Sequence, residues 1–301
     1  MCPARLSPLQ PIRILKTSRK AIGLVGLGLL GGALAERIRQ AGFDVPGFDV
    51  NPARRRALKE LGGRPLESAA EVAAACERIV LSLPTTAVVE SVVREMESKL
   101  RAGTVIIDTT TGEPGPTAAL GARLAKRRVR YLDATIVGNS EQVRTRDVIV
   151  LAGGTRPSVA ACRDVLECFA RQTFHVGPCG SGARMKLVIN LVLGLNRAVL
   201  AEGLSFAGTV GVSPERALEI LKSSAAYSRV MDTKGSKMLE RDFKPQARLS
   251  QHLKDVRLIL SLGKKAGAKL PLSALHRRLL EQVEAAGAGD LDNSAIFKAF
   301  E

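Results

Sequence analysis

The chain has 301 residues, 46% of them apolar and 25% charged, a composition that excludes a disordered or fibrous protein. This length exceeds the usual size of one hydrophobic core, so we expect two domains. The formal net charge of +16 favours anionic partners, but two Tyr, eight Phe and no Trp leave few side chains to stack on bases. We therefore expect no nucleic-acid partner and interpret most of the excess charge as a solvated basic surface.

The first twenty residues contain five basic side chains, no acidic one and no long apolar run, which argues against a secretory signal. We expect residues 1–19 to be a disordered basic tail or the result of a start codon assigned too early. Five cysteines without a CxxC pair predict neither a disulfide framework nor a zinc site, and three scattered histidines add no metal-binding spacing. Reduced thiols indicate a cytoplasmic protein.

From Lys20 onward, short β-branched runs alternate with helical patterns, which is typical of parallel βαβ units. The predicted strands cover residues 21–25, 44–48, 79–83, 105–108, 130–133, 148–151 and 174–176. The predicted helices cover residues 31–41, 52–61, 87–101, 116–126 and 157–169. Many of these helices begin at Pro or a small polar residue, as helix starts do. This part of the chain predicts a doubly wound parallel sheet.

The pattern changes after residues 177–182, because no strand pattern recurs before Glu301. The helices predicted here cover residues 184–210, 213–223, 251–266 and 271–286. The first of them would be about 40 Å long, enough to reach from one domain into another. Its apolar stretch, 187–201, contains Asn and Arg and is too short to span a bilayer, so we expect a buried helix and no membrane association. The predicted domains are 20–182 and 183–301.

A glycine turn follows the first predicted strand and opens the first predicted helix. In this context the GxGxxG spacing of Gly26, Gly28 and Gly31 predicts a dinucleotide site, because it permits a tight turn, close backbone approach to a pyrophosphate and close helix packing. The helix N-terminus offers unpaired N–H groups to the anion. The predicted contacts in this turn are Gly26, Leu27, Gly28, Leu29, Leu30 and Gly31.

Asp49 ends the second predicted strand, 23 positions after Gly26, where a carboxylate accepts hydrogen bonds from an adenosine ribose. Such a carboxylate would repel a 2′-phosphate, which favours NAD over NADP as the cofactor. Asn51 follows in the same loop and is included in the predicted site. The arginines at 54–56 could neutralise a 2′-phosphate, so NADP stays open, although an exposed helix face is the preferred interpretation of these three residues.

Six segments occur in an order that resembles the β-hydroxyacid dehydrogenase family, which includes the 3-hydroxyisobutyrate, tartronate semialdehyde and 6-phosphogluconate enzymes. These segments are GLVGLGLLGGALAERIRQAGFDVPGFDVNP (23–52), LSLP (81–84), IIDTTTGEP (106–114), DATIVGN (133–139), GSGARMKLVIN (180–190) and LKDVRL (253–258). The resemblance implies an α/β Rossmann domain, an all-helical C-terminal domain for substrate binding and dimerisation, and a homodimer or homotetramer.

The resemblance also implies a catalytic lysine at the start of the long helix, and Lys186 occupies that position. Asn190 lies one helical turn later on the same face, so both side chains can converge on one substrate group. In the family the lysine exchanges the hydroxyl proton while the asparagine helps to hold the lysine and the substrate. A lysine can do so if burial and nearby cations lower its pKa.

Four further positions carry cofactor roles by resemblance. Leu83 and Pro84 correspond to residues that line the cofactor, Thr111 to a hydroxyl residue near the nicotinamide, and Lys254 to a basic residue near the nicotinamide and substrate. Each of these could also be structural, as a strand end, a helix cap or a surface charge.

The segment 133–139 departs from the family pattern. Relatives typically read Asp-Ala-Pro-Val-Ser-Gly-Gly, whereas here the serine that helps to bind the substrate carboxylate is replaced by Val137. Backbone N–H groups around Gly138 and the amide of Asn139 could still receive an anion. A deleted hydroxyl changes a desolvated site by about 1–3 kcal/mol, enough to alter substrate preference.

These observations predict an oxidoreductase that transfers a hydride between NAD(P) and a small β-hydroxy acid. Two alternatives stay open. The substrate could be another anionic aldehyde or keto acid, or the fold could bind a dinucleotide without chemistry and serve as a scaffold. Lys186 argues against the scaffold, because some chromatin-associated relatives have lost this lysine and this chain retains it.

Overall fold

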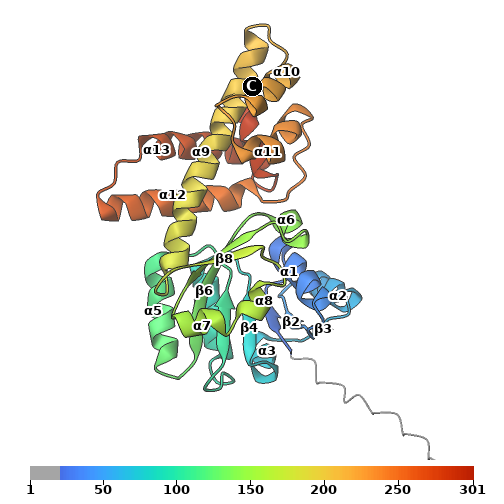
Figure 1. The fold of residues 1–301 in the computed structure, drawn as a ribbon, viewed down its shortest axis with the longest axis vertical. Coiled ribbons are helices and arrows are strands. Elements are labelled where there is room, and N and C mark those ends of the chain that lie inside the picture. Colours follow the sequence, from blue (N-terminus) through green and yellow to red (C-terminus); the bar gives the residue numbers. More distant parts are fainter. Residues whose placement is uncertain (1–20) are drawn as a thin grey trace, which may run out of the picture.

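The computed structural model describes residues 21–301, so the predicted tail at 1–19 lies outside the described residues. Figure 1 shows a lower part built around a sheet and an upper part built of helices, joined by α9. The eight strands are β1 (Gly23–Val25), β2 (Pro46–Phe48), β3 (Arg64–Pro65), β4 (Arg78–Leu81), β5 (Val105–Asp108), β6 (Arg130–Val137), β7 (Ile149–Gly153) and β8 (Gln172–Gly177). Their order is β3-β2-β1-β4-β5-β6-β7-β8, so the order in which the strands are added to the sheet reverses at β1. This confirms the predicted α/β class.

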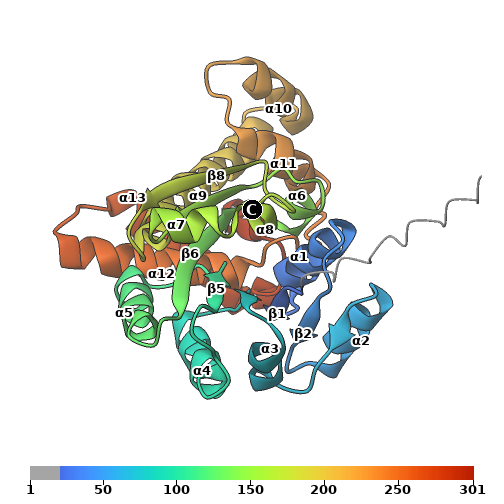
Figure 2. The same cartoon turned by 60° about the horizontal axis from the view of Figure 1, so that its bottom comes forward.

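Helices cover both faces of the sheet (Figure 2). The helices of this part are α1 (Leu29–Gln40), α2 (Pro52–Glu60), α3 (Ala69–Ala75), α4 (Thr86–Met96), α5 (Pro114–Ala125), α6 (Ser140–Arg144), α7 (Arg156–Ala160) and α8 (Arg163–Leu166). Successive side chains of a strand point to opposite faces. Leu24, Val80 and Leu132 therefore join one core with α1 and α8, while Val25 and Ile106 join a second core with α3, α4 and α5.

The sheet differs from the prediction in one pairing. β7 runs antiparallel to β6, with Asp133 opposite Gly153 and Val137 opposite Ile149, whereas an all-parallel sheet was predicted. The segment between them holds only the five-residue helix α6, which is too short for a parallel crossover.

The predicted helix 157–169 is also wrong, because the chain bends between α7 and α8 at Cys162.

The upper part contains helices only, as predicted. They are α9 (Ser181–Thr209), α10 (Pro214–Ser223), α11 (Arg229–Leu239), α12 (Leu249–Ala266), α13 (Pro271–Val283), the π-helical η1 (Glu284–Ala288) and the 3-10 helix η2 (Asn293–Phe300). α11 and η2 were not predicted. Within the described chain, α9 has the length and hydropathy of a membrane span. In the structure 44% of its most apolar stretch is buried, and the helix packs on β6, α12 and η2.

The glycine turn provides a test of the packing between α1 and the sheet. A Cβ at Gly31 would lie 1.9 Å from the carbonyl oxygen of Gly26, whereas a Cβ at Gly32 would have no neighbour closer than 3.8 Å. We expect Gly31→Ala to lower the free energy of unfolding by about 1–3 kcal/mol and to weaken NADH binding. Gly32→Ala, the matched control, should raise the free energy of unfolding by up to ~1 kcal/mol, because alanine restricts the unfolded chain and favours helix.

Urea denaturation and an NADH fluorescence titration measure the two effects. Equal stability of the two alanine variants would contradict this account of the turn.

Candidate active site

A cavity of about 830 Å³ lies where the carboxyl ends of the strands meet the helical part. Its lower wall comes from the segments that follow β1, β4, β5 and β6, including Gly26, Leu83, Thr111 and Val137. Its upper wall comes from α9, α11, α12 and the segment around Asn293. In an open α/β sheet, ligands bind outside the carboxyl ends of the strands, at the point where strand order reverses. This cavity occupies that place.

The glycine turn fits a dinucleotide pyrophosphate. Gly26 has φ +91°, and a Cβ there would lie 2.2 Å from the carbonyl oxygen of Ser82, so only glycine allows the turn. α1 begins at Leu29 after Gly28, which provides no side-chain cap, so the first N–H groups of the helix are left for an anion. Gly28, Leu29 and Leu30 line the cavity, whereas the side chain of Leu27 is buried in the core.

Asp49 is nearly fully buried and connects this turn to α2. Its carboxylate accepts hydrogen bonds from the backbone N–H of Leu27 at 2.7 Å and of Asn51 at 2.8 Å. Asn51 caps α2 by accepting from the N–H of Ala53, and it does not line the cavity. Arg54 forms an ion pair with Asp49 at 3.2 Å and does line the cavity. The preferred interpretation of the arginines at 54–56 as an exposed helix face therefore missed the contact of Arg54 with Asp49 and the cavity.

Leu83, Pro84 and Thr111 line the cavity, as expected of cofactor contacts. Lys254, by contrast, does not line the cavity. Its ammonium donates to the carbonyl oxygens of Pro84 at 3.2 Å and Thr111 at 2.7 Å. It also pairs with Asp255 at 3.0 Å. Lys254 thus connects α12 to the loops that follow β4 and β5, and positions the upper wall of the cavity over the lower one.

Lys186 lies on the first turns of α9 and lines the cavity although only 7% of its surface is exposed. Burial lowers the pKa of its ammonium to about 8, because the charged form loses hydration. The carboxylate of Asp255 opposes this shift, and the cations of Arg197 and Lys254 add to it. A lysine with such a pKa can exchange a proton near neutral pH, which an exposed lysine cannot do efficiently.

Asn190 lies one turn beyond Lys186 and is also buried. Its Nδ2 donates to Asp255 at 2.8 Å, and this bond orients the amide within the cavity. Sequence reasoning missed Asp255, although it belongs to the quoted LKDVRL segment and directly follows Lys254. Burial raises the pKa of Asp255, and the neighbouring cations of Lys254 and Lys186 oppose that shift.

The start of α9 is held by Asp133, a second residue that sequence reasoning did not single out for this role. Its carboxylate on β6 accepts from the N–H of Ala183 at 3.0 Å, and burial raises its pKa to about 7. The backbone N–H groups of the first turn stabilise the charged form and limit this rise. The contact places the first turn of α9, and therefore Lys186, next to the strand ends.

Val137, Gly138 and Asn139 line the cavity beside β6. Asn139 is engaged in a capping box at the start of α6, because its Oδ1 accepts from the N–H of Gln142 and its own N–H donates to Gln142 Oε1. Its backbone N–H therefore already has an acceptor, and its side chain serves α6.

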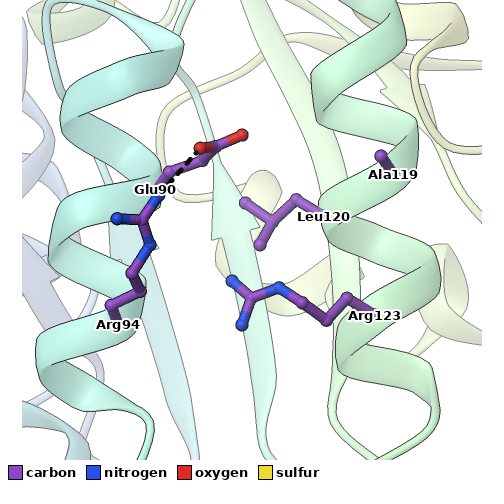
Figure 3. Close-up of a pocket in the computed structure, with 5 residues that line it drawn as sticks. All are labelled: Glu90, Arg94, Ala119, Leu120 and Arg123. Atoms are coloured by element: carbon purple, nitrogen blue, oxygen red, sulfur yellow. Dashed lines mark hydrogen bonds and ion pairs between the residues drawn. The ribbon is translucent and has the colours of Figure 1, made fainter.

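Two of the three histidines differ in their relation to the cavity. His175 contacts the carbonyl oxygen of Gly154 at 2.8 Å, away from the cavity, whereas His252 lines it. A separate hollow of about 310 Å³ lies between α4 and α5 (Figure 3). There Glu90 pairs with Arg94, and Arg123 pairs with Glu97, so its charges neutralise one another.

A dinucleotide turn that faces a buried lysine across one cavity defines a nicotinamide-dependent dehydrogenase. Two family profiles cover the chain. That of the NAD binding domain of 6-phosphogluconate dehydrogenase matches residues 21–177. That of the NAD-binding region of NADP-dependent 3-hydroxyisobutyrate dehydrogenase matches residues 180–300.

The chain is 32% identical over 284 residues to 2-(hydroxymethyl)glutarate dehydrogenase of Eubacterium barkeri, covering 93% of this chain and 94% of that protein. It is 27% identical over 283 residues to L-threonate dehydrogenase of Cupriavidus necator, covering 93% and 95%. Its fold matches the 3-hydroxyisobutyrate dehydrogenase of Mycobacterium tuberculosis with L-serine at a TM-score of 0.85 and 24% identity, over 94% of this chain and 100% of that chain. The chain belongs to the β-hydroxyacid dehydrogenase family and is an NAD(P)-dependent oxidoreductase of hydroxy acids.

The buried ammonium of Lys186 carries a measurable cost. The difference between a pKa of 10.5 and one of about 8 corresponds to about 3 kcal/mol. We expect Lys186→Met to raise the free energy of unfolding at pH 7 by up to about 3 kcal/mol. Between pH 8 and 10.5 the unfolded chain binds more protons than the folded one, so the stability of the wild type rises with pH. The stability advantage of Lys186→Met over the wild type therefore disappears across this range.

Urea denaturation from pH 7 to 10.5 checks this expectation, with Lys59→Met, a change at an exposed lysine of α2, as the control. A gain for Lys186→Met that stays constant across this range would show that packing, rather than charge, causes it.

Proposed function

We propose that Lys186 is the general base in the oxidation of a small β-hydroxy acid and the general acid in the reverse reduction. The observation that supports this most directly is the burial of its ammonium in the cavity, with a pKa of about 8. NAD(P) supplies the hydride acceptor when it is bound. In the oxidation, the neutral Lys186 Nζ takes the proton of the substrate hydroxyl.

Asn190 and Asp255 position this chemistry in our proposal. The bond from Asn190 Nδ2 to Asp255 leaves Asn190 Oδ1 to accept a hydrogen bond from the ammonium of Lys186. Lys254 keeps Asp255 in place and holds the loops at Pro84 and Thr111 against α12. The two walls of the cavity therefore stay together and exclude water, which strengthens every electrostatic interaction inside.

The scaffold alternative receives less support. A protein that only binds a dinucleotide does not need an ammonium in a desolvated wall, and keeping one there lowers stability. Lys186 and Asn190 are both present and both face the cavity.

The first test is turnover of Lys186→Ala. We expect kcat to fall at least about 10³-fold on C3 to C6 β-hydroxy acids, because the proton then has no acceptor, while the Kd for NADH changes less than about threefold. In the wild type, kcat/KM for oxidation should rise with pH and level off above about 8, and reduction should show the opposite dependence. Turnover in Lys186→Ala close to that of the wild type would refute the assignment.

We propose NAD as the preferred cofactor, because the carboxylate of Asp49 at the end of β2 would repel a 2′-phosphate. Arg54 is the counterargument, since it lies beside Asp49 and lines the cavity. Running the substrate screen with both NAD and NADP decides between the two.

The absence of disulfides among the four cysteines that the structure describes supports our proposal of a cytoplasmic location.

We further propose that α9 carries the interface of a homodimer, on which a tetramer could build. Large apolar side chains are exposed along one stripe of this helix, at intervals of four and seven residues, and 51–67% of each is accessible: Val188, Val192, Val199 and Phe206. An apolar stripe of this length on a long helix favours association with a second copy.

Replacing both Val199 and Phe206 with Glu in one variant should dissociate the dimer, because charges would enter an apolar interface. Light scattering after size exclusion measures the mass. Leu272→Glu, at an equally exposed apolar position of α13, is the control and should leave the mass unchanged. A wild-type monomer at micromolar concentration would overturn the proposal.

A further inference from the structure

Arg197 is a buried cation that the proposed reaction does not use. It follows Asn190 by seven residues and Lys186 by eleven, so the three side chains share one face of α9. Only 7% of Arg197 is exposed, and it lines the same cavity. Its pKa, lowered by burial to about 10, still leaves it charged at neutral pH. The cavity therefore continues past the catalytic lysine to a second cation.

Among residues 21–301, no carboxylate lies within 4.0 Å of the Arg197 guanidinium. Asp292 is engaged with Lys234 at 2.7 Å and accepts from the backbone N–H groups of Gln246, Ala247 and Ser294. Asp255 is engaged with Asn190 and Lys254. Both nearby acids thus have their own donors. They raise the pKa of Arg197 from a distance, but the guanidinium has no ion pair of its own among the described residues.

Two more polar side chains of this region lack partners within the described part of the chain. His252 Nε2 and Asn293 Oδ1 are buried without a hydrogen bond, as is Asp255 Oδ1, which has only its ion pair with Lys254, and all three residues line the cavity. Burial lowers the pKa of His252 well below its usual value, so the imidazole is neutral and does not compete for an anion. Buried polar groups are normally hydrogen-bonded, so unpaired groups around one space indicate a polar ligand, and among them the cation of Arg197 selects an anionic one.

We propose that Arg197 binds a second acidic group of the substrate, at the end distal to the reacting carbinol. The substrate class is then a β-hydroxy acid with two acid groups. This proposal rests on the proposed role of Lys186, which places the carbinol at the opposite end of the cavity.

Geometry favours a second acid group, rather than the carboxylate of the β-hydroxy acid unit, as the ligand of Arg197. The Arg197 Cα lies about 10 Å along the α9 axis from that of Asn190, and helical side chains lean toward the N-terminus, which brings the guanidinium toward Asn190. In a β-hydroxy acid one carbon separates the carbinol from the carboxylate, so that carboxylate stays beside Lys186. A group several bonds farther along the substrate reaches Arg197.

The chemistry of arginine fits this role. A guanidinium can hold a carboxylate through two parallel N–H···O bonds, and desolvation strengthens them. An unpaired buried charge destabilises the free protein, and a bound anion removes that cost. The same neutralisation raises the pKa of Lys186, because the Arg197 cation is one of the causes that lower it.

The test compares matched acids with the NADH-loaded protein. Glutarate and pentanoate, unreactive acids with chains of five carbons, measure binding by calorimetry. The matching β-hydroxy acids 2-(hydroxymethyl)glutarate, whose second carboxylate lies four bonds from the carbinol carbon, and 2-(hydroxymethyl)pentanoate, which lacks it, measure turnover. We expect the wild type to prefer the diacid at least about 30-fold in both measurements. Arg197→Met should reduce this preference to less than about threefold, with Arg197→Lys in between. The melting temperature of free Arg197→Met should equal or exceed that of the wild type.

Arg229→Met is the control for the general positive field, because Arg229 lines the same cavity but pairs with Asp147. It should leave the preference for the diacid within about threefold of wild type. The proposal is overturned if the wild type shows no preference, if Arg197→Met retains it, or if Arg197→Met weakens both acids equally. The last result would mean that Arg197 holds the single carboxylate.

Failure of the proposed function has a different signature. If Lys186→Ala turns over normally while glutarate still binds through Arg197, the catalytic role is wrong and the acid subsite stands. Should Arg197→Met unfold, Arg197→Gln, which retains a polar side chain, takes its place in both measurements.

Discussion

The bond between the Asp133 carboxylate and the first turn of α9 is the constraint on which the active site depends. It joins the middle of β6 to a helix of 29 residues that continues into the helical part. Because Lys186 and Asn190 lie on the first turns of that helix, any change in the contact moves both side chains relative to the glycine turn. A second connection, from Lys254 to the carbonyl oxygens of Pro84 and Thr111, holds the opposite wall.

Charge is distributed unevenly along α9. Near the strand ends, the ammonium of Lys186 is balanced in part by Asp255, whose other contacts are Asn190 and Lys254. Farther along, Asp292 and Asp255 act on Arg197 only from beyond 4.0 Å, while the nearby Lys234 pairs directly with Asp292. One cation thus sits where a proton must be exchanged and another where an anion would be held. This arrangement lowers the stability of the free protein and makes it complementary to an anionic ligand.

Several features were predictable because they depend on local chemistry. The glycine turn needs three glycines at fixed positions, since a Cβ at Gly26 or Gly31 would collide with a backbone carbonyl. The alternation of β-branched runs and helices follows from burial on both faces of the sheet. The short elements α3, α6 and η2 were missed because each is stabilised by caps and tertiary packing more than by its own periodicity. The antiparallel β7 was missed because pairing direction depends on the length of the connection.

By itself, the sequence determined the cofactor turn, most of the strands and helices in their order along the chain, and the spacing that puts Lys186, Asn190 and Arg197 on one face of a helix. Those properties follow from backbone sterics and the period of the α-helix, which act over a few residues. Only the tertiary structure decided which charges are paired. Asp255 meets Asn190 across 65 positions and Lys234 meets Asp292 across 58, so the isolation of Arg197 is a property of the packed helices and of no local pattern.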